Sequence, residues 1–298
     1  MMSLFRKPGA PWGMLLALVL ATDVRAEWAV DGEATTTYDS NVSRAERTRD
    51  VLSDESLLAS LAVVFSAEPT LNTALNVRGF VEGEAYREIT TLNRASAGGQ
   101  VMGRWQPVVT FTAPVYQLNL TAQLDDYDVK QRDSMVYTAQ AFASQHVNDR
   151  TTLAYGIEGV QRRSDGTVFD TTHTRLFINA DFALTDDVSA YAAYSYLHGD
   201  TISSAQVSFC NGVVANDIFG LIKASDALET DEAFNEKFCG SWLAYRLKAD
   251  THALTLGLNN AFSHKLSADF SVQGIDVNAK GDNNYQRLLV RLGLLARF

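Results

Sequence analysis

Alternation of apolar and polar residues with a period of two is the feature that most constrains this chain. The stretch YQLNLTAQL (116–124) is typical, because tyrosine and leucine alternate there with glutamine, asparagine and threonine. Successive side chains of a β-strand point to opposite faces, so such a stretch predicts a strand with one apolar face. Twelve segments of this kind follow one another, near residues 27–39, 55–66, 71–85, 97–106, 115–127, 134–146, 151–162, 170–184, 188–199, 241–262, 267–278 and 285–298.

The connections between these segments alternate between short and long. Four are tight, namely 67–70, 147–150, 185–187 and 263–266. The others are longer or strongly polar: 40–54, 86–96, 128–133, 163–169, 200–240 and 279–284. The connection around Pro107–Pro114 fits neither group, and the pattern defines strand boundaries least well at 106–115 and 236–252.

This rhythm is typical of transmembrane β-barrels, which have short periplasmic turns and longer extracellular loops. We therefore predict an all-β fold, a transmembrane antiparallel up-and-down β-barrel of about 12 strands. A soluble β-sandwich is the alternative, but it gives no reason for the alternation of short and long connections.

Composition narrows the possible functions. The 298 residues include 35 acidic and 25 basic ones, which gives a net charge of −10, and 46% are hydrophobic. An acidic chain without a basic stripe is a poor match for nucleic acid. The mean hydropathy of −0.08 would suit a soluble protein. In a barrel, however, the same value is the average of an apolar outer face and a polar inner face.

The N-terminus predicts export. Arg6 and Lys7 precede an apolar stretch at 11–21, and small residues suited to cleavage follow it. This order is that of a secretory signal peptide, whereas the stretch is too short for a spanning helix. A buried N-terminal helix is the alternative. We predict a signal peptide over residues 1–26 and a single barrel domain over 27–298.

Two cysteines, Cys210 and Cys239, lie in the 200–240 connection. An isolated pair in an oxidising compartment predicts one disulfide, which would stabilise the loop by roughly 3 kcal/mol. Asp217 and Ser225 are candidate N-caps of short helices within it. The loop is expected either to fold over the lumen as a constriction or to pack on itself at the surface. No Cys/His spacing predicts a metal, and we expect no cofactor.

The last strand carries a terminal signal. Its apolar face ends in Phe298 at the C-terminus, which resembles the C-terminal signature that the barrel-assembly machinery reads in Gram-negative outer-membrane barrels. Aromatic side chains near strand ends are also typical of barrels, because they suit the depth of the lipid headgroups. Nine are predicted to face lipid in this way: Trp28, Tyr38, Trp105, Tyr116, Tyr137, Tyr155, Phe262, Phe270 and Phe298.

The opposite face of each strand is predicted to line a narrow lumen. Closure of the barrel pairs the first strand with the last, which would bring Glu27, Asp31 and Glu33 alongside Arg291 and Arg297. Such charges either form a structural ladder along the seam or create a transverse field across a solute path. The candidate lumen or selectivity residues are Asp31, Glu33, Arg78, Glu82, Arg104, Arg175, Arg287 and Arg291.

The sequence gives little support to catalysis, although some outer-membrane barrels are hydrolases. Ser144 and His146 stand in the reverse order of the His-x-Ser pair of phospholipase-type barrels. His198, Asp200 and Asp125–Asp126 supply the residue types of omptin-type proteases without that family's ten strands and motifs. We expect the protein not to be an enzyme, with an outer-membrane hydrolase as the least favoured hypothesis.

The segment TYDSNV (37–42) ends the first predicted strand. It resembles the Tyr-Asp-(Ser/Asp)-Asn-(Val/Ile) motif of proteobacterial β-barrel porin families, including the type-2 porins associated with exopolysaccharide loci. The resemblance implies an outer-membrane porin over the whole mature chain.

We therefore expect a bacterial outer-membrane channel that passes small polar solutes or saccharides passively. The expected partners are membrane lipid, lipopolysaccharide, the barrel-assembly machinery and a small saccharide solute. A structural or surface-interaction barrel with a closed lumen is the alternative.

Overall fold

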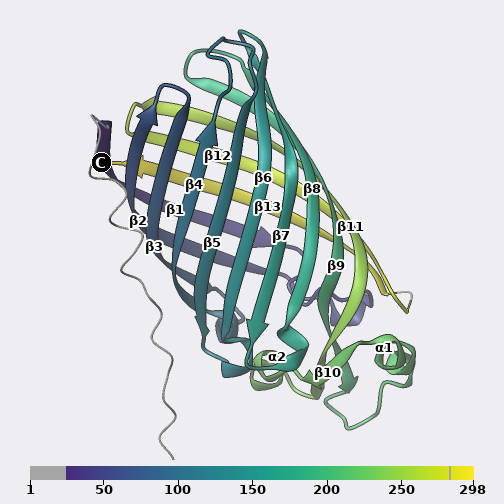
Figure 1. Cartoon of the computed structure of the whole chain (residues 1–298). Coiled ribbons are helices and arrows are strands. Elements are labelled where there is room, and N and C mark those ends of the chain that lie inside the picture. Colours follow the sequence, from purple (N-terminus) through teal and green to yellow (C-terminus); the bar gives the residue numbers. More distant parts are fainter. Residues whose placement is uncertain (1–24, 282) are drawn as a thin grey trace, which may run out of the picture.

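The computed structural model describes residues 25–281 and 283–298. Twelve strands form a closed antiparallel barrel, which confirms the predicted fold (Figure 1). They are β1 (Arg25–Asp39), β2 (Asp54–Thr70), β3 (Thr73–Tyr86), β4 (Arg94–Trp105), β5 (Val115–Tyr127), β6 (Ser134–Asn148), β7 (Thr151–Ser164), β8 (Thr171–Ala183), β9 (Val188–Ser208), β11 (Ser241–Ser263), β12 (Leu266–Ala279) and β13 (Asn283–Arg297).

Neighbouring strands in the sequence pair with one another, and two further pairings complete the barrel. β13 pairs with β1, and β9 pairs directly with β11. The four-residue strand β10 (Ala227–Thr230), which lies between them in the sequence, is added to the opposite, free edge of β11. Residues 1–24, most of the predicted signal peptide, lie outside the described residues. Arg25 and Ala26 are paired with Glu68 and Ala67 at the beginning of β1.

The two ends of the barrel differ as the connection lengths predict. The turn end carries the tight connections 71–72, 149–150, 184–187 and 264–265, together with the longer 106–114 and the C-terminus. The loop end carries 40–53, 87–93, 128–133, 165–170 and 209–240. In Figure 1 the turn end is at the top and the loop end at the bottom. The expected loop at 279–284 is instead a tight connection, because β12 runs to Ala279 and β13 begins at Asn283.

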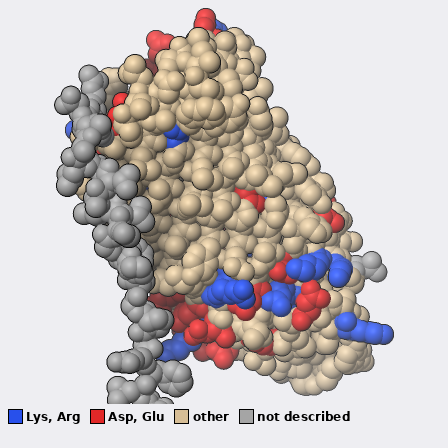
Figure 2. All heavy atoms as spheres, viewed as in Figure 1, with Lys and Arg blue, Asp and Glu red and all other residues tan. Residues whose placement is uncertain are grey.

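The outer wall is apolar over most of its height. Leucines on the outward face of several strands are about half exposed, such as Leu61 at 59%, Leu120 at 50% and Leu256 at 56%. All nine aromatic side chains predicted to face lipid are exposed. Figure 2 shows a broad uncharged face, with the charged residues mainly toward the two ends. So large an exposed apolar surface is unfavourable in water and favourable in lipid.

The long loop is shorter than its predicted range of 200–240. β9 continues to Ser208 and pairs with β11 as far as Ser241, so the connection is 209–240, which we call the lid. Residues 203–205 are buried one after another, and this removes the alternation by which a half-buried strand is recognised. The lid contains η5 (Asn216–Ile218), α1 (Phe219–Ala224), β10 and α2 (Glu232–Lys237). The predicted N-caps are wrong, because Asp217 lies within η5 and Ser225 ends α1.

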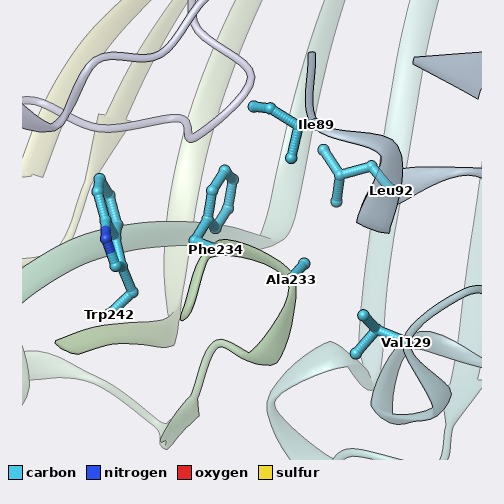
Figure 3. Close-up of a cluster of buried hydrophobic side chains, with 6 residues drawn as sticks. All are labelled: Ile89, Leu92, Val129, Ala233, Phe234 and Trp242. Carbon is cyan, nitrogen blue, oxygen red and sulfur yellow. The ribbon is translucent and has the colours of Figure 1, made fainter. Parts of the chain in front are cut away.

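Buried apolar side chains gather at the loop end, where the lid meets shorter loops. Figure 3 shows the cluster of Ile89, Leu92, Val129, Ala233, Phe234 and Trp242. The first two come from the connection that contains η2 (Thr90–Leu92), and Val129 precedes η3 (Lys130–Arg132). Alpha-helix α2 is thus packed across the mouth of the barrel. Among the described residues, no helix is long and apolar enough to cross a membrane.

Candidate functional site

The predicted lumen residues lie on the inward faces of the strands, at different heights. Asp31, Glu33 and Arg78 line one cavity of about 690 Å³ near the turn end. Arg175 and Arg287 line another cavity, of about 300 Å³, near the loop end. These two groups are therefore not one site but two, separated along the barrel axis.

Three candidates remain apart from these groups. Glu82 lies 3.9 Å from Arg94, to which it is linked by an ion pair. Arg291 faces inward on β13, opposite Thr37, and no carboxylate in the described part of the chain lies within ion-pair distance of it. Arg104 is exposed near the C-terminal end of β4, on the rim of the turn end, so it does not line the narrow part of the lumen.

The seam between β1 and β13 carries charge pairs, but only some of the predicted ones. Arg297 binds both carboxylate oxygens of Asp31, at 2.7 and 3.0 Å. Arg287 makes an ion pair with Asp39 farther along the seam. Glu33, however, stands opposite Leu295 rather than an arginine, because the register is set by the whole strand pair.

A second charge network lines β3, β4, β5 and β7. Arg94 contacts Glu84 at 3.2 Å and the fully buried carboxylate of Asp125 at 3.6 Å. Arg162 approaches the same carboxylate at 3.1 Å. Sequence reasoning did not select Arg94, although it stands directly opposite Glu84 in the strand pairing. Most acids in this part of the lumen are therefore neutralised by arginines.

The lid is tied to the loops around the mouth. The predicted disulfide is confirmed, since Cys210 and Cys239 are bonded at its base. The Thr91 hydroxyl donates to the carbonyl of Ala233 at 2.7 Å. The backbone N–H of Thr167, in η4 (Thr167–Phe169), donates to Glu229 at 2.8 Å.

A cluster of charges fixes the other side of the lid. Arg47 is the N-cap of η1 (Thr48–Asp50), and Arg49 lies within η1. They contact the Asp217 carboxylate at 2.8 and 2.7 Å, respectively. The hydrogen bond from Arg49, followed by that from Arg47, lowers the pKa of Asp217 to about 2. The lid is thus held on both sides, and it covers the loop end.

The connection 40–53, which we call the first loop, folds inward beneath the lid. Asn41 and Ser43 are only 2% exposed, and the Ser43 carbonyl accepts the N–H of Ser204 on β9 at 2.9 Å. Asn41 holds the turn, because its side chain binds the backbone of Ala45 in both directions, at 2.8 and 3.0 Å. The constriction expected from 200–240 is therefore shared with a loop that sequence reasoning left aside.

Arg44 sits at the tip of this inward fold. Its φ of 54° is the one positive φ found at a non-glycine residue among those described. Such a conformation costs an L-residue about 1–2 kcal/mol. Arg44 lines the cavity that Arg175 also lines and a second cavity, of about 300 Å³, under the lid. Burial, followed by the charge of Arg287, lowers the pKa of the Arg44 guanidinium.

The residues considered for catalysis are dispersed. His198 binds Asp250 at 2.8 Å on the outer wall, whereas Asp200 is paired with Lys248. Asp125 belongs to the arginine network described above. No group of three or more potential metal ligands occurs in residues 25–281 and 283–298.

No family model matches the sequence, and no curated protein matches it. The fold is similar to the COG4313 outer membrane channel from Pseudomonas putida F1, with a TM-score of 0.60 and 8% identity over 91% of this chain and 95% of that chain. The chain therefore has the fold of an outer-membrane β-barrel. A structure of the KdgM porin in complex with disordered oligogalacturonate matches less well, with a TM-score of 0.43 and 9% identity over 91% of this chain and 99% of that one. In outer-membrane barrels the short turns face the periplasm, so we expect the lid to face outward.

Proposed function

We propose that the barrel is an outer-membrane channel that passes small polar solutes or saccharides passively. The observation that carries this proposal is the charged inner wall. It extends from Arg78 near the turn end to Arg175 and Arg287 near the loop end. A purely structural barrel of this width can be filled with uncharged side chains, whereas a hydrated charged wall suits a polar solute. The candidate selectivity residues of the inner wall act in this proposal through their charges.

The proposal has a finer form, in which the solute is a secreted saccharide and the chain is related to the type-2 porins of exopolysaccharide loci. The support comes from the TYDSNV segment. Asp39 of this segment pairs with Arg287, the Ser40 hydroxyl accepts the N–H of Leu288, and Asn41 holds the first loop. These residues of the motif thus join the seam of the barrel to the loop that enters the lumen.

Export and assembly belong to the same proposal. A signal peptide over 1–26 delivers the chain, and Phe298 is read by the assembly machinery. Both backbone hydrogen bonds of Phe298 are made with Val30, at 2.9 and 3.1 Å, so the terminal residue is part of the seam. Lipid and lipopolysaccharide surround the apolar wall.

Single-channel conductance in a planar bilayer tests the channel. The matched variant lacks residues 211–238 and keeps the two cysteines, whose Cα atoms are 5.1 Å apart and are easily joined by a short glycine linker. We expect the variant to conduct more than the wild type. Absence of conductance from both proteins, in samples that show the heat-modifiable mobility of a folded barrel, would rule out the channel.

One observation favours a second candidate, a surface barrel with a closed lumen. The lid is tied to the first loop and to the loops that contain η2, η3 and η4. In this case, the deletion variant also stays closed, and the outer surface of the lid is the functional face. We propose no covalent chemistry for either candidate. Hydrolysis of labelled phospholipid or peptide, lost on His198→Ala, would contradict that view.

A further inference from the structure

Arg44 is a half-buried cation that the first loop directs into the barrel at its loop end, where it has no counter-ion. Among the described residues, no side-chain hydrogen bond or ion pair satisfies its guanidinium. Removal of a charge from bulk water is unfavourable unless a partner of opposite charge compensates for it. The compensating group is therefore expected to come from outside the chain.

The acids nearest to Arg44 are already engaged. Two cavities meet at this side chain, and the acidic residues in their walls are Asp39, Glu84 and Asp200. Each is bound to another cation: Arg287, Arg94 and Lys248, respectively. The remaining titratable groups in the two walls are basic or phenolic: Tyr86, Tyr127, Arg132, Arg162, His173, Arg175 and Tyr285. Arg132, Arg162 and Arg175 are themselves paired with Asp231, Asp125 and Glu158. Among the described residues of the two walls, Arg44 is thus the one arginine without a carboxylate partner, and this unpaired charge favours an anion.

The backbone indicates that this position is specified rather than incidental. Arg44 adopts a left-handed conformation that an L-residue with a long side chain seldom takes. Two backbone hydrogen bonds fix the turn. The N–H of Arg44 donates to the Asn41 carbonyl at 3.1 Å, and the Ser43 carbonyl accepts the N–H of Ser204 on β9. A strained residue persists only where the surrounding structure enforces it, and such residues cluster at ligand sites.

We propose that Arg44 is the primary contact of an anion-binding site in the lumen, which takes the oxyanion group of a sugar-sized solute. The oxyanion is a carboxylate or a phosphate, because the planar guanidinium donates two parallel hydrogen bonds to either group. Each cavity is about 300 Å³, at the lower end of the range for small-molecule sites. This inference rests on the proposed function, since a solute that crosses the lumen passes Arg44.

The walls explain why a sugar ring suits the remaining space. Tyr86 and Tyr127 line the cavity under the lid and offer flat rings with hydroxyl groups. Ser43 and Ser204 add small polar side chains to the same wall. Such a mixture of aromatic faces and hydroxyl groups binds a solute that is apolar on one side and rich in hydroxyls on the other.

Calorimetric titration of the full barrel, purified from outer membranes into detergent, tests the site. The probes are D-glucuronate, glucose 6-phosphate and glucose, which share a ring and differ in charge. We expect one or both anions to bind at least tenfold more tightly than glucose. Binding of glucuronate alone identifies a carboxylate site, and binding of glucose 6-phosphate alone identifies a phosphate site. Equal binding of glucose, or no binding of either anion, would overturn the site.

Two variants assign the binding to Arg44. Arg44→Asn removes the charge with a residue that tolerates the left-handed conformation, and we expect the affinity for the anion to fall about ten- to hundredfold. Arg104→Asn removes the same charge at the exposed rim and should leave the affinity unchanged. Equal affinity of Arg44→Asn and the wild type would overturn the assignment. The wild-type comparison of glucuronate with glucose needs no variant, so it stands even if Arg44→Asn fails to fold.

The two proposals fail independently. Conductance without anion binding would leave the channel and remove the site. Anion binding without conductance, even after deletion of 211–238, would leave the site and remove the channel.

Discussion

Arg132 and Asp231 form the ion pair that fixes the lid to the barrel, with one guanidinium nitrogen 3.0 Å from both carboxylate oxygens. Asp231 is fully buried, and its carboxylate also accepts the hydroxyl of Ser204 at 2.5 Å. The guanidinium lies over the ring of Phe169, 4.3 Å from its centroid. The pair thus joins the lid, η3, η4 and β9 at one point.

Asp231→Ala should therefore release the lid and leave the barrel folded. Removal of one partner of a buried pair leaves the other charge uncompensated, which costs about 3–5 kcal/mol. We expect proteolysis within 209–240 to become at least a hundredfold faster, with unchanged heat-modifiable mobility. Glu236→Gln, an exposed change in α2, the helix that Asp231 precedes, is the control and should have no effect. This role would be contradicted if the lid of the Asp231→Ala variant resisted proteolysis as well as the lid of the wild type does.

The attachment of the lid to the first loop should depend on pH. The pKa of Asp217 is lowered to about 2 in the folded protein, below the usual 3.8. The stabilisation is therefore complete above about pH 4 and is lost as the pH falls toward 2. Hydrogen exchange in residues 40–53, corrected for the intrinsic rate, should accelerate over this range. Asp217→Asn should show the faster exchange already at pH 5 and no further change on acidification.

Gly98 should tolerate no side chain. A Cβ at this position would overlap the ring of Phe80, which packs across the strand inside the lumen. We expect Gly98→Ala to lower the free energy of unfolding by about 1–3 kcal/mol, because an overpacked ring has to move. A Cβ at the neighbouring Gly99 would be 3.8 Å from the nearest atom around it. Gly99→Ala should therefore change the free energy of unfolding by less than about 0.5 kcal/mol. Urea titration in lipid vesicles measures both.

The two charge pairs of the seam should differ in strength. Arg297 is 65% exposed, so Arg297→Gln should cost less than about 1 kcal/mol. The Asp39 and Arg287 side chains are only 12% and 16% exposed, and Arg287→Gln should cost about 3 kcal/mol. The same urea titration compares the two variants. Equal losses would show that burial does not determine the strength of these pairs.

The strands and the outward face were predictable from the sequence because both follow from local alternation. Each residue of a lipid-facing row is two positions from the next, so YQLNLTAQL defines its strand without reference to any partner. The prediction failed at residues 200–208. There both faces of β9 are covered by other loops, and the alternation is lost.

The charge partners were predictable only in part. Alternation places Glu33 and Arg291 on the inward face, but it does not determine which residues stand opposite each other across the seam. Asp31 meets Arg297 as expected, whereas Glu33 meets Leu295. Register depends on the stagger of the whole barrel, which no single strand encodes.

The inward fold of the first loop was not predictable from strand patterns. Arg44 lies in a polar connection, where an arginine is ordinarily solvated. Its position depends on the Asn41 side chain and on the contact of Ser43 with Ser204 of β9, 161 residues away in the sequence. The TYDSNV segment was the one indication of this loop in the sequence, because it contains residues that hold the loop in place.

The disulfide at the base of the lid has a consequence for the evolution of the barrel surface. Cys210 and Cys239 close the ends of the loop to the width of an ordinary hairpin, directly beyond the last paired residues of β9 and β11. The segment between them is therefore an exchangeable cassette, which can be replaced without a change in the shear of the barrel. A barrel built in this way can change the sequence and length of its lid while its apolar wall stays the same.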